Sequence, residues 1–318
     1  MCEDLGVQLY ELTLDLPRVL KHPCLLLWTV GTLIRLKPRG VIVQNPSLLL
    51  ALLVVVLRYV LNYSVVVDAH NEAISPFQPK WKWIMRPSRY LQKVADLTIV
   101  TNHELADIVK RNYGRPFILQ DKLPKFPYGT APALRGSFNV VCICTFAKDE
   151  PVLEVVEAAR RLDRDYAIYV TGNYRGNGAR VTNLAIPPNV ILTGYLPEDE
   201  YIALLRGADV ILDLTYMDDC LVCGAYEAVA LGKPMIVSDS KAAREYFYKG
   251  AVYVSNEPSA IAKAIQTICM DLARYESDVR ELRRELEDRW APKREEVLSV
   301  LETLTGTRPG SIQQRSYP

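Results

Sequence analysis

Two acidic residues stand eight positions apart in a stretch that has the form of a loop, a helix and a strand. The stretch covers residues 218–239, DDCLVCGAYEAVALGKPMIVSD, and it contains Asp219 and Glu227. A carboxylate early in a helix, at Glu227, can accept hydrogen bonds from two neighbouring hydroxyls, as a ribose presents them. A carboxylate in the preceding loop, at Asp219, can meet sugar hydroxyls or a positive charge that develops during a reaction.

The start of the same helix offers a place for phosphates. The first backbone N–H groups of a helix have no partner within it, and the helix dipole adds positive charge there. A diphosphate would lie against the residues of this turn, which are Leu221, Val222, Cys223 and Gly224. Acids for sugar and ribose, with amides for phosphates, describe a nucleotide-sugar site. From the spacing alone, a capped surface helix with scattered acids remains the alternative.

Strands and helices that would position these residues alternate along the chain. The first part predicts strands at 7–12, 40–45, 63–69, 96–101 and 117–119, and helices at 17–36, 47–61, 80–94 and 103–112. The second part predicts strands at 138–146, 166–172, 189–194, 208–214 and 250–254, helices at 151–161 and 198–206, and a helical pattern from 257 to about 304. Such alternation is typical of an α/β fold with parallel sheets.

A length of 318 residues exceeds the size at which one core stops growing, about 250–300 residues. Residues 120–137 contain three prolines and two glycines without apolar periodicity, which is typical of a linker. We therefore expect two doubly wound, Rossmann-like domains that face each other across a cleft. The N-terminal domain, on the acceptor side, would cover residues 1–130, and the C-terminal domain, which binds the nucleotide-sugar, would cover residues 138–288. A closing helix at 289–304 would return to the first domain, and a flexible tail would cover residues 305–318.

The composition is that of an ordinary globular protein, with 49% apolar and 24% charged residues. Seven cysteines form no disulfide-like pattern, which favours a reducing, cytoplasmic compartment. Residues 1–130 hold 16 Lys and Arg against 10 Asp and Glu, whereas the remainder holds 22 against 27. The basic first part favours an anionic partner, and we expect no nucleic acid because no recognised reading module is present.

The apolar run at 47–67 approaches the length of a membrane span. Arg58 lies near its centre, and Asn62, Tyr63 and Ser64 interrupt it. An arginine at the centre of a span costs roughly 2.5–3.5 kcal/mol on an insertion scale. We therefore interpret the run as a buried helix followed by a buried strand, with a true span as the alternative.

The second half resembles the nucleotide-binding domain of retaining GT-B glycosyltransferases over residues 138–254. That family carries two glutamates separated by seven residues, followed by Ala-x-Ala-x-Gly-x-Pro, and DCLVCGAYEAVALGKP at 219–234 occupies the same frame. The first acid is here Asp219, and the glycine that follows it two residues later in the family is absent. NVILTGYLPEDEYIALLRGADVILDL at 189–214 and SDSKAAREYF at 238–247 match further pieces of the family pattern in order.

The resemblance implies catalysis at Asp219, ribose binding at Glu227 and a UDP- or GDP-sugar as donor. It also implies that basic side chains and amides stabilise the diphosphate, so no metal or other cofactor is expected. Lys148 and Arg175 follow predicted strands and are the candidate phosphate partners. Two other patterns are typical of metal sites, but we interpret both without a metal. The Asp-x-Asp at 163–165 lies in a predicted turn, and the cysteines that could form a zinc site, Cys142, Cys144, Cys220 and Cys223, are explained as small packing residues.

The first half resembles the β-1,4-mannosyltransferases that act on lipid-linked chitobiose, and related bacterial glycosyltransferases. The shared pieces are QNPS, with Gln44 and Asn45, and DAHN, with His70 and Asn71. His70 would be a catalytic residue, and Gln44, Asn45 and Asn71 would lie on the acceptor side. The first strand and glycine-rich turn of that family have no counterpart here. We therefore expect a shortened first domain, a truncated gene, or one chain of a two-chain enzyme whose partner supplies the segment.

These residues predict a hexosyltransferase that moves a sugar from a nucleotide diphosphate-sugar to a lipid-linked or polysaccharide acceptor, with retention and without a metal. The alternative is a non-catalytic sugar-nucleotide-binding subunit of a two-chain glycosyltransferase. A nucleotide-sugar epimerase on the same fold is a third interpretation, but its catalytic residues are not recognisable.

A basic and aromatic segment at 79–93, PKWKWIMRPSRYLQK, favours a peripheral position at the inner face of an anionic membrane. A solvated amphipathic helix is the alternative interpretation. If the segment binds lipid, changing Lys80→Glu and Lys82→Glu together should weaken binding to anionic vesicles at low salt and leave nucleotide affinity unchanged. Each basic residue contributes about 1 kcal/mol at such a surface, and salt screens the attraction. Flotation with vesicles measures this, and retention through high-salt and carbonate washes would instead indicate a span.

Overall fold

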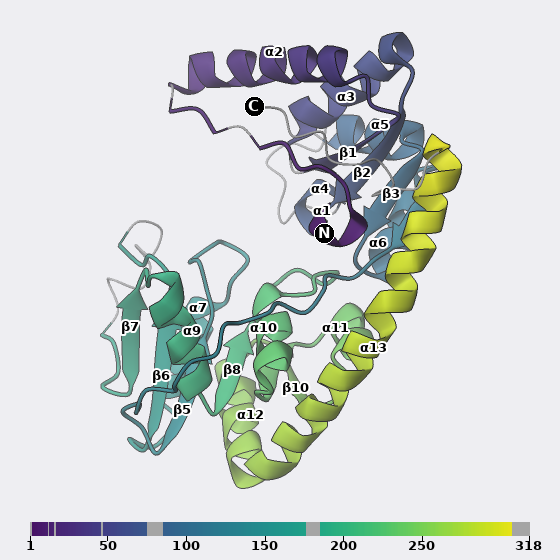
Figure 1. Ribbon diagram of the computed structural model, residues 1–318. Helices are drawn as coiled ribbons and strands as arrows, with labels where there is room; N and C mark the ends of the chain where they lie inside the picture. Colours follow the sequence, from purple (N-terminus) through teal and green to yellow (C-terminus); the bar gives the residue numbers. More distant parts are fainter. Residues whose placement is uncertain are drawn as a thin grey trace. The chain divides into compact units, whose positions relative to one another are not determined.

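The computed structural model describes residues 2–11, 13–15, 17–45, 47–74, 85–175 and 185–306 (Figure 1). The chain divides into two compact units. Unit 1 comprises Met1–Asp121 and Arg289–Pro318, and unit 2 comprises Lys122–Asp288. Residues 120–137, the predicted linker, form no helix or strand, and those from Lys122 onward are grouped with unit 2. Leu123 of this segment is buried in the unit 2 core.

Unit 1 contains a parallel sheet whose strands lie in the order of the chain. The strands are β1 (Gly40–Asn45), β2 (Ser64–Ala69), β3 (Leu97–Val100) and β4 (Pro116–Ile118). Their side chains enter two cores. Val65 and Val67 pack on one face, and Val66 packs on the other. Burial on both faces explains why these strands read as continuous apolar runs.

The helices of unit 1 include the apolar run at 47–67. They are α1 (Cys2–Leu5), α2 (Arg18–Leu36), α3 (Leu48–Leu61), α4 (Asn71–Ile74), α5 (Met85–Val94) and α6 (His103–Arg111). The run forms α3 and then β2, as predicted. Asn62 ends α3 in the left-handed conformation, with φ 52°. The Arg58 guanidinium donates to Asp96 at 2.9 Å and to the Val94 carbonyl at 2.8 Å. In the described part of the chain, no helix is long and apolar enough to cross a membrane.

The predicted strand at 7–12 is wrong: residues 7–11 form neither strand nor helix, and Leu12 lies outside the described residues. Leu9 is exposed, whereas Val7 packs against a core of unit 1 without joining its sheet. Of the predicted helix at 80–94, residues 85–94 form α5, and the remainder lies outside the described residues.

Unit 2 contains a six-stranded parallel sheet with the order β10-β9-β8-β5-β6-β7. The strands are β5 (Phe138–Cys142), β6 (Tyr166–Thr171), β7 (Val190–Gly194), β8 (Val210–Asp213), β9 (Met235–Ser238) and β10 (Ala251–Val254). The chain runs outward from β5 to β7, returns to the other side of β5 and continues outward from β8 to β10. This is the Rossmann order, and its reversal between β5 and β8 is the position at which ligands bind in such sheets.

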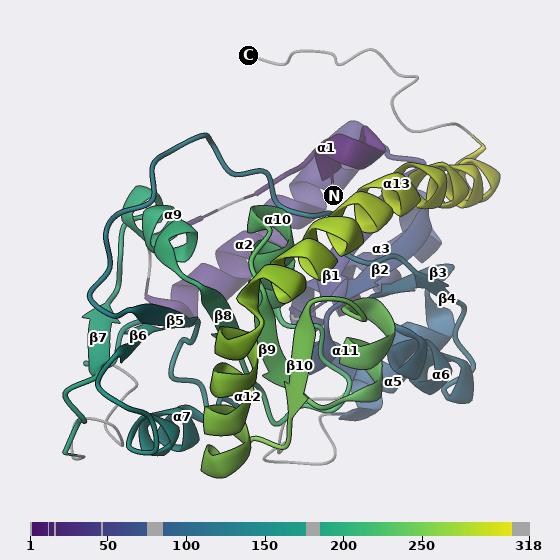
Figure 2. The same cartoon turned by 90° about the horizontal axis from the view of Figure 1, so that it is seen from below.

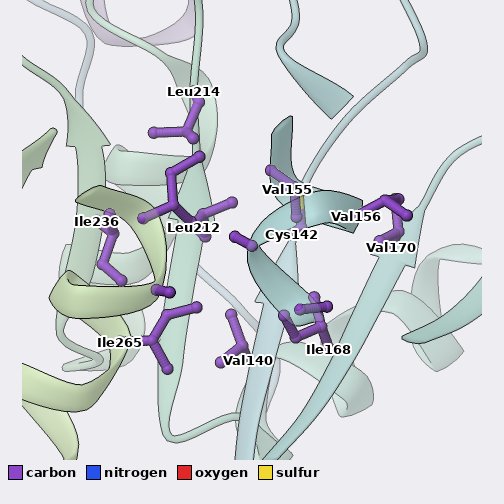
Figure 3. Packing of buried hydrophobic residues seen from close by; sticks show 14 of the residues in the cluster. Val140, Cys142, Val155, Val156, Ile168, Val170, Leu212, Leu214, Ile236 and Ile265 are labelled. Carbon is purple, nitrogen blue, oxygen red and sulfur yellow. The ribbon is translucent and has the colours of Figure 1, made fainter. Parts of the chain in front are cut away.

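Helices cover both faces of this sheet. They are α7 (Val152–Ala159), α9 (Glu198–Gly207), α10 (Cys223–Leu231), α11 (Lys241–Tyr246), α12 (Pro258–Met270) and α13 (Leu272–Thr305). The core between the sheet and α7 and α12 contains Val140, Ile168 and Leu212 (Figure 3). The opposite core contains Val141 and side chains of α9, α10 and α11. Neighbouring residues of one strand thus enter opposite cores, as the pleat requires.

The predicted closing helix at 289–304 is the last part of α13, which Figures 1 and 2 show as one long helix. Val279 and Leu282 near its start are buried in unit 2, and Val297 and Leu301 near its end are buried in unit 1. The predicted strand at 138–146 is shorter than expected. It ends at Cys142, and beyond it Cys144 N–H donates to Thr171 Oγ1 at 3.3 Å, while residues 145 and 147 donate their N–H groups to Glu150.

Candidate functional site

The loops after β5 and β8 meet at the reversal of the unit 2 sheet. Residues 143–151 follow β5, and residues 214–222 follow β8 and lead into α10. Asp149 joins the two loops, because its carboxylate accepts from Thr215 Oγ1 at 3.2 Å and its carbonyl accepts from Tyr216 N at 2.7 Å. The loops at the carboxyl ends of β5 and β8 are therefore joined to each other within unit 2.

Glu150 closes the turn that follows β5. Its carboxylate accepts from the backbone N–H groups of Thr145 and Ala147, each at 2.9 Å, and from Thr145 Oγ1 at 3.0 Å. A carboxylate with three donors holds the turn in a defined shape. The exposed Lys148 lies on this same turn, so its position beside the strand end is fixed by the chain around it.

The N-terminus of α10 contacts a carboxyl group that the sequence did not point out. No side chain of the preceding residue caps the helix. Gly224 N–H donates instead to Asp213 Oδ2 at 2.8 Å, and Asp213 is the last residue of β8. A Cβ at position 224 would lie 2.6 Å from the same oxygen, so only glycine fits here. An acid that ends an apolar strand was the signal in the sequence.

Asp213 is the most strongly perturbed carboxyl group of this surface. Its pKa is raised to about 8, mainly by burial and also by the charges of Glu150, Glu227 and Asp149, while the hydrogen bond from Gly224 N–H lowers it. A carboxyl group with this pKa is largely protonated at neutral pH. Its neutral form does not repel an anion at the start of α10.

Glu227 lies early in α10, on its second turn, and contacts a tyrosine that sequence reasoning missed. Its Oε2 accepts from the Tyr201 hydroxyl at 2.6 Å. Burial raises the pKa of Glu227, and the hydrogen bond from Tyr201 lowers it. Burial and the carboxylate also raise the pKa of Tyr201, so the phenol remains a donor. Tyr201 belongs to α9, and no local sequence feature marks it, because the contact depends on how α9 packs on α10.

Asp219 lies in the turn between β8 and α10 and is half-buried. Of the four residues expected to meet a diphosphate, Leu221 and Gly224 are buried, Val222 is half-buried and Cys223 is exposed. They form the end of this turn and the first residues of α10, so the structure places them together with Asp213 at the sheet reversal.

A polar network closes the other side of the same loop. Thr215 N–H donates to Ser238 Oγ at 2.9 Å, and that hydroxyl donates to Asn256 Oδ1 at 2.7 Å. Asn256 Nδ2 in turn donates to the Thr215 carbonyl at 2.8 Å. The network ties the ends of β8, β9 and β10 together.

The two candidate phosphate partners come from neighbouring strands. Lys148 follows β5, and Arg175 follows β6 and is also exposed. The Arg175 guanidinium lies 5.7 Å from the centre of the Tyr174 ring. Within the described ranges, no group of three or more His, Cys, Asp or Glu residues is arranged to hold a metal.

The candidate residues of unit 1 gather at the carboxyl ends of β1 and β2. Gln44 is paired in register with Asp68, and Asn45 with Ala69. The His70 Nε2 lies 3.8 Å from Asp68 Oδ2. Burial raises the pKa of Asp68, while His70 and the hydrogen bond from Gln44 lower it. Asp68, which sequence reasoning did not single out, thus lies between Gln44 and His70.

Asn45 and Asn71 differ in their surroundings. Asn45 is 1% exposed, and its Oδ1 has no hydrogen-bond partner among the described residues. A buried amide oxygen without a partner is uncommon in folded proteins. Asn71 is the first residue of the short helix α4 and is half-buried.

Comparison with known proteins identifies the kind of domain that unit 2 contains. Residues 137–271 match the sequence model of the family described as "Glycosyl transferases group 1". A comparison with curated protein sequences gives no significant match. The family match and the fold together indicate a transferase enzyme, a glycosyltransferase.

Similar solved structures have the same two-domain fold. Sucrose-phosphate synthase from Thermosynechococcus elongatus has a TM-score of 0.73 and 15% identity, over 92% of this chain and 80% of that chain. Anabaena HepE in complex with UDP and glucose has a TM-score of 0.71 and 12% identity, over 94% and 86%. A putative UDP-N-acetylglucosamine 2-epimerase from Listeria monocytogenes has a TM-score of 0.62 and 12% identity, over 97% and 87%. The fold is therefore GT-B, as the sequence predicted.

The pKa of Asp213 predicts how stability depends on pH. An aspartate in an unfolded chain titrates near pH 4, and Asp213 in the folded chain titrates at about 8. Between these values the folded state binds more protons, so this contribution to the free energy of unfolding is present below about pH 4 and is lost as pH rises through 8. The slope is at most about 1.4 kcal/mol per pH unit.

Asp213→Asn keeps an acceptor for Gly224 N–H but cannot ionise. We expect the variant to lose less stability than the wild type when urea unfolding is compared at mildly acidic and neutral pH. Asp163→Asn, in an exposed turn, is the control. An unchanged slope in Asp213→Asn would assign the pH dependence to another group.

Proposed function

We propose that the protein transfers a hexose from a nucleotide diphosphate-sugar, UDP- or GDP-linked, to a lipid-linked or polysaccharide acceptor, with retention and without a metal. The observation that carries the proposal is the position of Glu227 and the start of α10 at the reversal of the unit 2 sheet, inside the matched segment. The solved HepE structures, which contain UDP, glucose or UDP-glucose, support a nucleotide-sugar as the donor.

Unit 2 would bind the donor through complementary groups. Glu227 would accept hydrogen bonds from the ribose hydroxyls, with Tyr201 holding one carboxylate oxygen in place. The diphosphate would lie at the turn 221–224, where a neutral Asp213 does not oppose its charge. Lys148 and Arg175, on the two neighbouring loops, would supply positive charge to the leaving group.

The proposed reaction breaks the bond between the anomeric carbon and the diphosphate oxygen. The nucleoside diphosphate leaves with the bonding electrons, and the acceptor hydroxyl forms the new bond on the same face of the sugar. The hydroxyl proton passes to the departing diphosphate oxygen. Asp219 would stabilise the positive charge on the sugar ring as it develops.

Unit 1 would contribute the acceptor side. His70 would be the catalytic residue that contacts the acceptor hydroxyl. Asp68 would orient the His70 imidazole, since its Oδ2 lies 3.8 Å from His70 Nε2. Gln44 and Asn71 would bind acceptor hydroxyls, whereas Asn45 is buried. A peripheral position at the cytoplasmic face of a membrane would bring such an enzyme to a lipid-linked acceptor.

One observation favours a second candidate, a sugar-nucleotide-binding subunit without catalysis that works with a partner chain. Asp219 stands where the family carries glutamate, and an aspartate is one methylene shorter. A shorter side chain retains binding to the donor but places the carboxylate farther from the reacting carbon. The following two experiments separate the donor site from catalysis.

The first experiment tests the donor site. Glu227→Ala should weaken binding of the preferred nucleotide by roughly 1.5–3 kcal/mol, the value of hydrogen bonds to a charged group. Isothermal titration calorimetry with UDP and GDP measures the change. Glu227→Gln is the matched control for shape, because it keeps an acceptor without the charge. Unchanged affinity in Glu227→Ala would refute the ribose role.

The second experiment tests catalysis. With its donor and a membrane extract, the enzyme should release free nucleoside diphosphate. Asp219→Asn should slow this release far more than it weakens donor binding, because charge stabilisation matters most in the transition state. Donor binding without turnover across the common nucleotide sugars would support the subunit instead.

A further inference from the structure

Helix α2 carries exposed apolar side chains along one face. Leu20, Leu27 and Ile34 are 57%, 72% and 52% exposed. Cys24 and Gly31, which are also exposed, fill the intervening positions of this face. A spacing of three or four residues places side chains on the same side of a helix. Leu33, on the opposite side, is buried in the unit 1 core.

Helix α3, which packs against α2, carries a second set of this kind. Leu49, Val56 and Val60 are 58%, 59% and 80% exposed, and their spacing of seven and four residues also places them on one face. Figure 1 shows α2 and α3 beside each other in unit 1. We call these exposed faces, defined by Leu20, Leu27, Ile34, Leu49, Val56 and Val60, the α2–α3 surface. Apolar side chains gathered on a surface in this way mark an interaction site.

The charged residues of the segment that contains α2 and α3 have one sign. Lys21, Trp28 and Arg35 are spaced by seven residues and form a line beside the apolar face of α2. Lys37 and Arg39 follow the end of the helix, and the sequence has no Asp or Glu between Asp15 and Asp68. The line places an indole and two basic side chains next to the exposed leucines.

The basic side chains at this surface are available to a partner. Lys21, Arg35, Lys37 and Arg39 form no ion pair within the part of the chain that the structure describes. Arg58 of α3 is different, because it is bound to Asp96. The surface thus combines exposed apolar groups with uncompensated positive charge.

We propose that the α2–α3 surface docks on an anionic lipid bilayer. Exposed leucine, isoleucine and valine side chains enter the boundary between headgroups and acyl chains, and the flanking tryptophan and basic residues contact the headgroups. A protein partner would also cover apolar side chains, but the absence of acidic residues over this stretch favours an anionic surface. The proposal deepens the proposed function, because it rests on a lipid-linked acceptor and assigns the surface that brings the enzyme to it.

Cosedimentation of the full chain with phosphatidylcholine vesicles, with and without phosphatidylglycerol, tests the proposal. We expect the wild type to bind the anionic vesicles and the double variant Leu27→Asp/Ile34→Asp to bind at least about tenfold more weakly, since two apolar side chains are lost from the lipid contact. Met270→Asp is the matched control, because Met270 is 79% exposed but lies on α12 of unit 2. Equal thermal unfolding of the three proteins excludes a folding defect.

Charge and position are tested by two further variants. Lys21→Glu/Arg35→Glu should remove the preference for anionic vesicles. Brominated lipids should quench the tryptophan fluorescence of the wild type more than that of Trp28→Phe, which separates this surface from the tryptophans of segment 79–93.

Three results would overturn the proposal: equal binding to neutral vesicles, wild-type binding by Leu27→Asp/Ile34→Asp, or a wild-type dimer in light scattering that this variant converts to a monomer. The last result would assign the surface to a second copy of the chain. All measurements are made without nucleotide, so their outcome is separate from that of the donor-site and turnover experiments.

Discussion

The hydrogen bond from Gly224 N–H to the Asp213 carboxyl group joins the last residue of β8 to the start of α10. It sets where the helix begins relative to the sheet, and a side chain at position 224 would break it. Because Glu227 lies on the next turn of the same helix, its place beside Tyr201 depends on this contact as well. The arrangement of the proposed donor site therefore follows from one strand end and one glycine.

Acidic side chains are numerous where the proposal requires an anion to bind, and each has a partner. Glu150 accepts from the turn after β5, Asp149 from Thr215, and Glu227 from Tyr201. The pKa of Asp213 is raised to about 8 by burial and by its acidic neighbours, so this carboxyl group is largely neutral. Burial, with a smaller contribution from the neighbouring acids, thus produces the neutral group beside the start of α10. The exposed Lys148 and Arg175 lie on the loops after β5 and β6.

The sequence predicted most of the fold because each unit alternates apolar strands with helices over long ranges. The polar residues that follow Leu61 correctly predicted the boundary between α3 and β2. The strand expected at 7–12 failed because apolar alternation alone does not supply a neighbouring strand. For the site, the positions of Glu227 and Asp219 followed from chain order. Tyr201 and Asp213 could not be assigned from spacing, since their contacts arise only when α9, α10 and β8 pack together.

A crystal structure of the protein with its preferred nucleoside diphosphate would show directly how the nucleotide is bound. We expect the ribose hydroxyls within hydrogen-bonding distance of Glu227 and the diphosphate against the backbone of residues 221–224. A nucleotide bound elsewhere in the chain, with Tyr201 as the only group that donates a hydrogen bond to Glu227, would contradict the proposed donor site.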